Sequence, residues 1–527
     1  MTVRQVQDGE MQQNGIFQKI VNSDDFPLLF VVLLKIILHL ITINRYGYFI
    51  DELYNIAATR HLSYGILEMS SLGPLIYAGW IFLFGPSMAS IRILALIPGV
   101  MTVWMSGLIA RELGGKRPAQ IMTALFVCLG PVWLAFNSFL GCDGFDQAAT
   151  SVFLFLLIRI LKTGNQKLWI AAGIAAGTAI LFKQTLFFYL LALFFSLLLT
   201  KQRKVFLNGY LWSGVLCGFL ILIPQFFRGF WDNWPLLEYW YLYAHYRTYH
   251  ASLVEFAVMQ GLLYSPLAAP VWIAGGCNFI FNKKMQQYRT LGLLYIFLMP
   301  VCFVLNVKAY VGAAIYPVLF AGGFILLEEY LAAGWKKKVR LAYTGLLIVT
   351  LLLGIPHGLP LFNIQNQAKY FQFFSFVNSR VKFDNFTKVT LPEHMADRIG
   401  WEERVKAVAD VYNNLADDEK RKTSIYAAYY GFAGAIDLLG KKYNLPDALS
   451  GHASYHLWGY GNQRPENLIT VQVPCESLAS VCEDVRIGGY IPFIPYAMPY
   501  DNDKPICVCR KMKYSIEEIW PLTRHYD

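Results

Sequence analysis

Two adjacent acidic residues follow the first long apolar run of the chain. The segment "YFIDELYNIAATRH", residues 48–61, contains Asp51 and Glu52. Adjacent side chains on a helix point about 100° apart, so only one of the two acids can face a given site. An acid at a helix start can simply cap the backbone N–H groups. A partly desolvated carboxylate beside a bilayer could instead act as a general base on a hydroxyl or an amine, which makes both acids catalytic candidates.

Two lysines and a tyrosine lie at the predicted outer ends of apolar runs. Lys308 and Tyr310 belong to "NVKAYVGAAIYPVLFAGG", and Lys183 belongs to "AILFKQTLFF". Placing an ionisable side chain within a membrane costs about 2.5–3.5 kcal/mol, so such residues are functional candidates. The alternative is that each lysine only extends its ammonium group to the lipid headgroups. If the lysines are functional, their charge would stabilise a phosphate group that leaves during a reaction.

A second pair of acids, Asp143 and Asp146, lies in the predicted external turn "GCDGFDQAA". An ordinary turn with a helix cap would explain them as well as a substrate site would. The aromatic segment 231–250 is typical of an interfacial belt, although it could also stack on sugar rings. Together, the acids, cations and aromatic residues favour a reaction in which a carboxylate activates an acceptor and a lipid-linked phosphate departs.

The composition is that of an α-helical polytopic membrane protein. Of the 527 residues, 56% are hydrophobic and 15% are charged, whereas a soluble chain carries about 25% charged residues. Runs of about 20 apolar residues, the length that spans a bilayer as a helix, recur through the first two thirds. The N-terminal residues do not resemble a cleaved signal peptide. Basic cytoplasmic loops explain the net charge of +10, and we expect no nucleic-acid partner.

Short basic clusters predict the topology, because cytoplasmic loops are enriched in lysine and arginine. These clusters are at 111–117, 162–167, 201–204, 282–289 and 336–340. The apolar stretches around them predict about eleven membrane-spanning helices. The predicted spans are 26–43, 90–110, 119–136, 147–161, 168–182, 184–200, 206–227, 256–280, 290–306, 309–332 and 341–356. The N-terminus would then be cytoplasmic, and a transmembrane catalytic module would occupy residues 1–357.

Two segments are predicted to lie outside the cytoplasm. The loop 44–89 contains two short helices that we expect at the membrane surface. Residues 358–527 have the mixed composition of a soluble α/β domain, with a clear amphipathic helix in "WEERVKAVADVYNNL". The C-terminal domain would therefore be extracytoplasmic.

Cysteine usage agrees with this placement, because disulfides form in an oxidising compartment. Four of the nine cysteines lie in the predicted external domain: Cys475, Cys482, Cys507 and Cys509. A Cys475–Cys482 bridge and free buried thiols are alternative hypotheses. We expect the two side chains of the "CVC" segment to leave their strand on opposite faces, which would make them a poor metal site.

Several longer segments resemble one family. "DELYNIAATRHLSYG", followed by "FGPSMASIRILALIPGVMTVWMSGLIARELGGKRPA", resembles the bacterial polyprenyl-phosphate-sugar glycosyltransferases of the GT-C superfamily. The resemblance is to the dolichyl-phosphate-mannose protein mannosyltransferase group (family 39), whose relatives include the lipid A aminoarabinose transferases. "VKAYVGAAIYPVLFAGG" is similar to the Lys-x-Tyr stretch of this family. The external "LPEHMADRIGWEERVKAVADVYNNL" is similar to the soluble tail of one bacterial subgroup.

The resemblance implies roles for individual residues. Asp51 matches the catalytic aspartate that the family places in its first external loop. Lys308 and Tyr310 match the side chains that hold the lipid phosphate, and Lys183 and Arg92 are further candidates for that role. Possible contributors to an acceptor or sugar site are Asp143, Asp146 and His61.

Two departures from the family pattern limit what the resemblance implies. In the aminoarabinose transferases an acid and a lysine precede the proline of the second surface helix, whereas Leu72 and Gly73 stand there in this chain. This difference leaves open both an aminoarabinose donor and the participation of a divalent metal ion. In addition, Val311 replaces the second tyrosine that often follows the Lys-x-Tyr pattern.

The expected function is that of an inverting glycosyltransferase at the outer face of a bacterial inner membrane. It would move a hexose or pentose from a polyprenyl-phosphate donor to an envelope acceptor, which could be a glycolipid, a glycan or a protein. One alternative is a secondary transporter or flippase of a lipid-linked or anionic substrate, and another is a non-catalytic scaffold. Transporters usually have internal repeats and a polar site near the midplane. Here no repeat is evident and the polar residues gather at one face.

Overall fold

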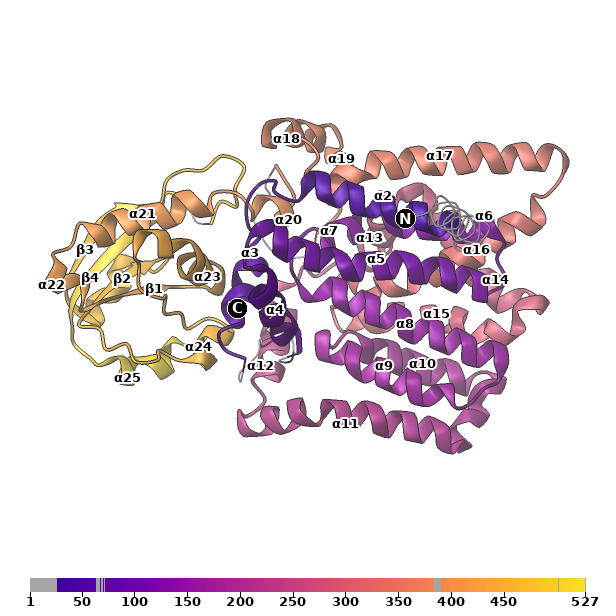
Figure 1. The fold of residues 1–527 in the computed structure, drawn as a ribbon, viewed down its shortest axis with the longest axis horizontal. Coiled ribbons are helices and arrows are strands. Elements are labelled where there is room, and N and C mark those ends of the chain that lie inside the picture. The colour runs from indigo at the N-terminus through magenta and orange to yellow at the C-terminus, as the bar shows by residue number, and fades with distance from the viewer. Residues whose placement is uncertain are drawn as a thin grey trace, which may run out of the picture.

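The computed structural model describes residues 26–62, 67, 70, 72–382, 390–500 and 502–526. Long helices run side by side along the longest axis of the molecule, and a smaller domain lies at one end of this bundle (Figure 1). The bundle helices are α2 (Phe26–Thr42), α5 (Met88–Glu112), α6 (Arg117–Leu129), α7 (Pro131–Phe136), α8 (Cys142–Thr163), α9 (Leu168–Phe182), α10 (Leu186–Leu198), α11 (Gly209–Trp231), α13 (Leu253–Leu263), α14 (Ala269–Phe281), α15 (Arg289–Val304), α16 (Tyr316–Tyr330) and α17 (Gly334–Gly358).

Length and hydropathy identify this bundle as a membrane module. Within the described residues, six helical stretches are long and apolar enough to cross a membrane on their own: α5, α8, α11, α17, Lys283–Val304 and Ala309–Tyr330. Two more pass the same test only as bent pairs, which are α10 with Lys201–Leu207 and α13 with Pro266–Phe281. The helices α2, α6 and α9 are shorter apolar segments. The polytopic helical fold is thus confirmed, while the number of eleven spans stays a prediction.

Two of the predicted spans are broken at prolines. The stretch 119–136 forms α6 and α7, which are separated at Gly130 and Pro131. The stretch 256–280 forms α13 and α14, which bend by 97° at a break that contains Pro266. Proline lacks the backbone N–H that a continuous helix needs, so both breaks have a local cause. Helix α7 and the α13–α14 bend both border the cavity described below.

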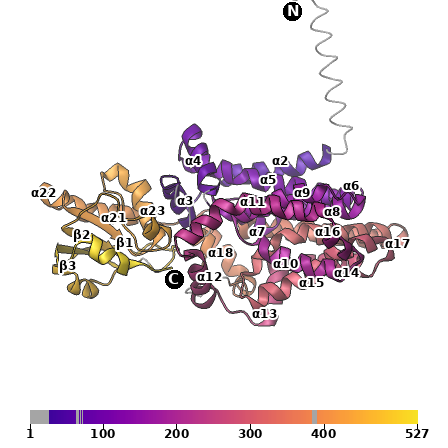
Figure 2. The same cartoon turned by 90° about the horizontal axis from the view of Figure 1, so that it is seen from below.

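The segment between α2 and α5 contains two short helices, as the sequence predicts. Helix α3 spans Ile50–Ala58 and α4 spans Leu72–Phe84. The end of α4 exposes three large apolar side chains, Phe82, Leu83 and Phe84. Figure 2 shows α3 beside α23 (Tyr430–Leu439) of the smaller domain, so α3 lies between the two parts of the molecule.

The smaller domain is an α/β unit built on one mixed sheet. Its strands are β1 (Thr423–Ala427), β2 (Asn467–Val471), β3 (Cys482–Tyr490) and β4 (Pro505–Met512), in the order β1-β2-β4-β3. Strands β1 and β2 pair in parallel, and β4 pairs antiparallel with both β2 and β3. The helices before and around the sheet are α18 (Ile364–Phe373), α19 (Ser375–Asn378), α20 (Glu393–Ala396), α21 (Trp401–Asn413), α22 (Asp417–Lys420), α23, α24 (Ser454–Trp458) and α25 (Ile516–Ile519). Helix α21 is the predicted amphipathic helix.

The cysteine pairing differs from the hypothesis of a Cys475–Cys482 bridge. Cys475 bonds to Cys507, and Cys482 bonds to Cys509. The expectation that the "CVC" side chains leave on opposite faces was also wrong. Side chains alternate along a strand, so Cys507 and Cys509, two positions apart on β4, share one face. That face packs against the segment that carries their two partners.

Helix α3 and the smaller domain share one hydrophobic core. Leu53 and Ile56 of α3 belong to the same buried cluster as α21, α23 and the sheet. The approach is close: a Cβ atom added to Gly434 of α23 would lie 2.9 Å from the backbone of Leu53. The Tyr54 hydroxyl also donates a 2.5 Å hydrogen bond to Ser454 of α24. The domain at the end of the bundle therefore helps to set the position of α3.

Candidate active site

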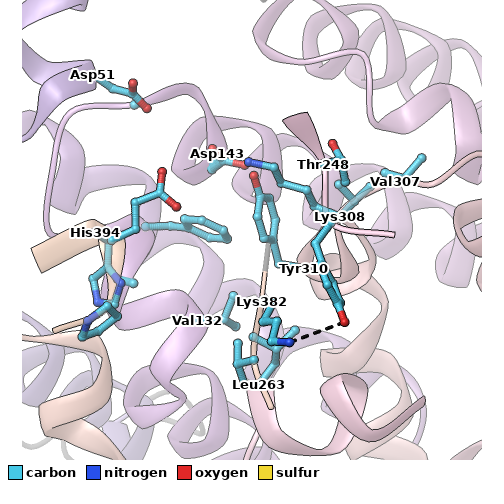
Figure 3. Close-up of a pocket in the computed structure, with 18 of the residues that line it drawn as sticks. Asp51, Val132, Asp143, Thr248, Leu263, Val307, Lys308, Tyr310, Lys382 and His394 are labelled. Atoms are coloured by element: carbon cyan, nitrogen blue, oxygen red, sulfur yellow. Dashed lines mark hydrogen bonds between the residues drawn. The ribbon is translucent and has the colours of Figure 1, made fainter. Parts of the chain in front are cut away.

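A cavity of about 1850 Å³ lies where the helical bundle meets the smaller domain. Its walls come from α3, the turns before α8 and α10, the segment 239–251, the short 3-10 helix Ala309–Ile315, and α23. Asp51, Asp143, Lys308 and Tyr310 are grouped around it in Figure 3. One region is polar, and another is lined by apolar side chains such as Val132 and Leu263. The cavity therefore offers both a charged site and an apolar compartment.

Asp51 lies in the first turn of α3 and lines the cavity. The hydroxyl of Tyr430, from the smaller domain, donates a 3.0 Å hydrogen bond to its Oδ1 atom. In Figure 3 the Asp51 carboxylate points into the space shared with Asp143 and Tyr310. A carboxylate in this position can accept a proton from a bound hydroxyl or amine.

Glu52, by contrast, turns away from the cavity and is fully buried. Both of its oxygens accept hydrogen bonds from Arg92, and one also accepts from the Phe49 N–H at the start of α3. Neither Glu52 nor Arg92 lines the cavity. The structure thus places Glu52 and Arg92, which the sequence offered as catalytic and phosphate-binding candidates, in an ion pair outside the cavity. Of the two adjacent acids, only Asp51 reaches the cavity.

Asp143 and Lys183 lie together in the cavity wall. The Lys183 ammonium contacts Asp143 Oδ1 at 2.7 Å and lies 5.4 Å from the centre of the Tyr310 ring. Asp143 lies at the start of α8 and Lys183 directly follows α9, so the ends of two neighbouring helices bring them together. Of the two predicted phosphate lysines, Lys183 is thus already neutralised by an acid.

Lys308 and Tyr310 begin the short 3-10 helix Ala309–Ile315. The Lys308 ammonium lies 4.9 Å from the centre of the Tyr243 ring and 5.9 Å from that of Tyr310. Aromatic faces attract a cation and hold it in place. Hydrogen bonds from the Gln260 side chain to the Ala309 carbonyl and from the Tyr189 hydroxyl to the Val311 carbonyl fix the backbone around them. Lys308 is therefore presented to the cavity from a rigid segment.

The remaining predicted acceptor-site residues lie elsewhere. Asp146 is buried behind the cavity wall, where the Thr185 hydroxyl donates to it at 2.6 Å. His61 stacks on Trp458, with ring centres 4.5 Å apart. Burial, and then the nearby Arg60 cation, lower the pKa of His61. Neither residue lines the cavity, so of this predicted group only Asp143 belongs to the site.

Tyr430 and Lys382 are among the cavity residues that sequence reasoning missed. Tyr430 contacts Asp51 from a position 379 residues later in the chain. Lys382 lies 4.7 Å from the centre of the Tyr249 ring and donates a 3.5 Å hydrogen bond to its hydroxyl, as the dashed line in Figure 3 marks. No local sequence motif indicates either residue, because only the folded structure brings them to the site.

The sequence left open whether a divalent metal ion takes part in the reaction. Across the residues that the structure describes, no group of three or more histidine, cysteine or acidic side chains could hold one. Asp51 is bound by Tyr430, and Asp143 is bound by Lys183. The polar lining of the cavity combines carboxylates, lysines, tyrosines and histidines.

Two comparisons show what the chain is similar to. Residues 70–227 match the sequence profile of a family described as dolichyl-phosphate-mannose-protein mannosyltransferase. The ArnT structure from Cupriavidus metallidurans, bound to undecaprenyl phosphate, superposes with a TM-score of 0.60 over 92% of this chain and 98% of that chain, at 12% sequence identity. The chain therefore shares the GT-C fold, and residues 70–227 are similar in sequence to the mannosyltransferase family. No curated protein matches the chain by sequence.

Other solved structures show the same GT-C fold. The apo form of the same ArnT has a TM-score of 0.56 and 12% identity, covering 91% of this chain and 97% of that one. An oligosaccharyltransferase from Archaeoglobus fulgidus, tethered to an acceptor peptide, has a TM-score of 0.50 and 14% identity, covering 81% of this chain and 64% of that one. At these identities the likeness concerns the fold, so the function has to be argued from the residues of this chain.

Proposed function

We propose that this protein is an inverting glycosyltransferase that uses a polyprenyl-phosphate sugar as donor and acts at the outer face of the membrane. The observation that carries the proposal is the arrangement of one cavity. Asp51 lies on one side of it, and Lys308, Tyr310 and the Asp143–Lys183 pair lie on another. The undecaprenyl phosphate bound to the similar ArnT structure supports a lipid phosphate as one ligand.

In the proposed reaction, Asp51 accepts the proton of an acceptor hydroxyl or amine as this group attacks the anomeric carbon of the sugar. A bond forms between the acceptor and that carbon, and the bond between the carbon and the phosphate oxygen breaks. The phosphate leaves with the electron pair, still attached to its polyprenyl chain. Attack opposite to the leaving group inverts the anomeric centre.

The cations of the site are suited to the leaving phosphate. The Lys308 ammonium, which lies near the Tyr243 and Tyr310 rings, would meet the negative charge that grows on the phosphate oxygen. The Tyr310 hydroxyl can donate a hydrogen bond to the same group. Lys183 lies beside them and shares its charge with Asp143. We assign the donor phosphate to Lys308 and Tyr310, with the Asp143–Lys183 pair next to them.

The apolar compartment fits the hydrocarbon part of a lipid-linked substrate. Val132 of α7, Leu263 at the end of α13 and Leu353 of α17 line it. These elements belong to the membrane module, so a chain that enters here could remain in the lipid phase up to its phosphate. We propose that the donor places its polyprenyl chain among these helices and its phosphate at Lys308.

The two rival functions have less support. A transporter would need its polar site near the midplane, whereas the site of this chain lies next to the smaller domain at one end of the bundle (Figure 1). A non-catalytic scaffold would have no need to bring Asp51 and Lys308 to one cavity. Their convergence favours an enzyme.

The most direct test compares envelope glycolipids, glycans and proteins from cells with and without this protein by mass spectrometry. We expect one class to lose a hexose or pentose in the absence of the protein, and expression of the wild-type chain should restore it. The Lys308→Ala variant should not restore it. Identical glycan profiles in the two strains, under conditions where the protein is expressed and folded, would contradict the proposal.

A further inference from the structure

The acid proposed as the base is held by a residue of the smaller domain. Tyr430 is the first residue of α23 and lines the same cavity as Asp51. Its hydroxyl donates to Asp51 Oδ1 at 3.0 Å. We propose that Tyr430 is a positioning residue for the base, and that the smaller domain therefore completes the catalytic site. This inference rests on the proposed function, because it assigns a role in the same reaction.

The Tyr430 ring is fixed on two sides. The Tyr54 ring of α3 lies 4.4 Å from it, centre to centre, and the His452 ring stacks on it at 5.1 Å with an angle of 12°. His452 also accepts a 3.2 Å hydrogen bond from the Tyr430 backbone N–H through Nδ1. His452 in turn stacks on His525 at 4.9 Å. The Tyr430 hydroxyl therefore contacts Asp51 from a ring that its neighbours hold in place.

Helix α3 is independently fixed at its start. The buried Glu52–Arg92 ion pair ties α3 to the membrane module, and Gly434 of α23 packs against the Leu53 backbone. The backbone of Asp51 is therefore held by both parts of the molecule. The hydrogen bond from Tyr430 acts on the side chain itself and favours one orientation of the carboxylate.

Restraining the carboxylate matters because of the geometry of proton transfer. A base has to lie within about 2.6–3.2 Å of the proton donor's heavy atom. A carboxylate that turns about its side-chain bonds loses this distance for part of the time. A hydrogen bond to a charged group contributes about 1.5–3 kcal/mol, which is enough to favour one orientation. Losing the tyrosine hydroxyl should therefore slow transfer while leaving the donor site intact.

The test is a double-mutant cycle on the full-length protein in lipid nanodiscs, with transfer followed by mass spectrometry. Tyr430→Phe keeps the ring and removes only the hydroxyl. We expect turnover to fall about ten- to a hundredfold, with the KM for the lipid donor within about twofold. In the Asp51→Asn background the same change should alter the residual rate by less than about twofold, because the restrained base is already absent.

A matched control distinguishes this role from a general effect on the domain. Tyr412→Phe also removes a tyrosine hydroxyl from the smaller domain, where it donates to the Lys420 carbonyl at 3.2 Å, and it should leave turnover unchanged. Wild-type turnover in Tyr430→Phe, or an equal loss with and without Asp51, would overturn the inference alone. Full transfer by Asp51→Asn would instead overturn the assignment of Asp51 as the base. A wild-type protein that transfers no sugar would overturn the proposed function.

Discussion

Arg92 binds both oxygens of the Glu52 carboxylate, with Nε and Nη2 each 3.0 Å from one oxygen. Both side chains are almost completely removed from solvent. Arg92 also donates to three carbonyl groups in the turn 43–47 that leads into α3. The pair therefore locks the start of the helix that carries Asp51. Two adjacent acids thus have different tasks, one structural and one facing the cavity.

Glu52→Gln should impair folding rather than chemistry. The change leaves the Arg92 cation buried without its carboxylate, and breaking a buried pair in this way costs about 3–5 kcal/mol. We expect a lower folded yield and a lower unfolding midpoint in detergent. The control is Arg60→Gln, which removes half of an exposed ion pair with Asp447 and should change stability by less than about 1 kcal/mol. A Glu52→Gln protein with wild-type stability but no transfer would make Glu52 catalytic.

Lys308→Ala should slow departure of the lipid phosphate. A cation placed at developing negative charge in a dry site contributes several kcal/mol, so turnover should fall by about 10²–10³. Lys308→Arg keeps the charge and should recover part of the rate. Lys284→Ala, which removes an exposed lysine outside the cavity, serves as the control. Unchanged turnover and donor dependence in Lys308→Ala would mean that this lysine only reaches toward the lipid headgroups.

The disulfides provide a test of the topology. The pairs Cys475–Cys507 and Cys482–Cys509 would form only if the smaller domain lies in an oxidising compartment. We expect all four thiols to resist alkylation in unreduced membranes, and peptide mapping to return these two pairs. Each bridge closes a loop that should stabilise the domain by about 3–4 kcal/mol, so reduction should lower its unfolding midpoint. Four free thiols in freshly prepared membranes would place the domain in the cytoplasm.

Asp437 should give the smaller domain a distinct dependence on pH. Burial raises the pKa of this carboxyl to about 6, although hydrogen bonds from the Ala448 N–H and the Tyr455 hydroxyl oppose the shift. The folded domain therefore retains a proton that the unfolded chain releases between about pH 4 and pH 6. The contribution of Asp437 to the free energy of unfolding therefore becomes more favourable as the pH falls through 6.

Comparison with Asp437→Asn isolates this contribution. When the pH is lowered from about 7.5 to about 5, the free energy of unfolding of the wild type should rise by roughly 1 kcal/mol relative to that of the variant, which cannot titrate at this position. Thermal unfolding of both proteins across this range measures the difference. Parallel stability profiles would show that Asp437 has no raised pKa in the folded domain.

Local sequence signals predicted the architecture well. Apolar runs of bilayer length indicated the membrane helices, and the periodicity of residues 401–415 predicted α21. Both signals are contained in one continuous stretch of chain. The break at Gly130 and the bend at Pro266 were missed because hydropathy averages over a window and does not register a single break.

A site residue could be predicted from the sequence only where its own charge and its place beside an apolar run indicate a function. Asp51 and Lys308 follow from charge at the end of an apolar run, and the structure brings both to the cavity. Arg92 has the same kind of signal, but its partner Glu52 is 40 residues away and the pairing is a property of packing. Nothing in the local sequence around Tyr430 indicates its role, since its contact with Asp51 depends on the packing of the smaller domain against α3.

The measurement that tests the account most directly is sugar transfer by Asp51→Asn. Asparagine keeps the shape of the side chain and can still accept the hydrogen bond from Tyr430, so the protein should fold and bind the lipid donor as the wild type does. It cannot take up the acceptor proton, and transfer should fall by about 10²–10⁴. Transfer at a near-wild-type rate would show that Asp51 is only part of a helix start and would contradict the mechanism.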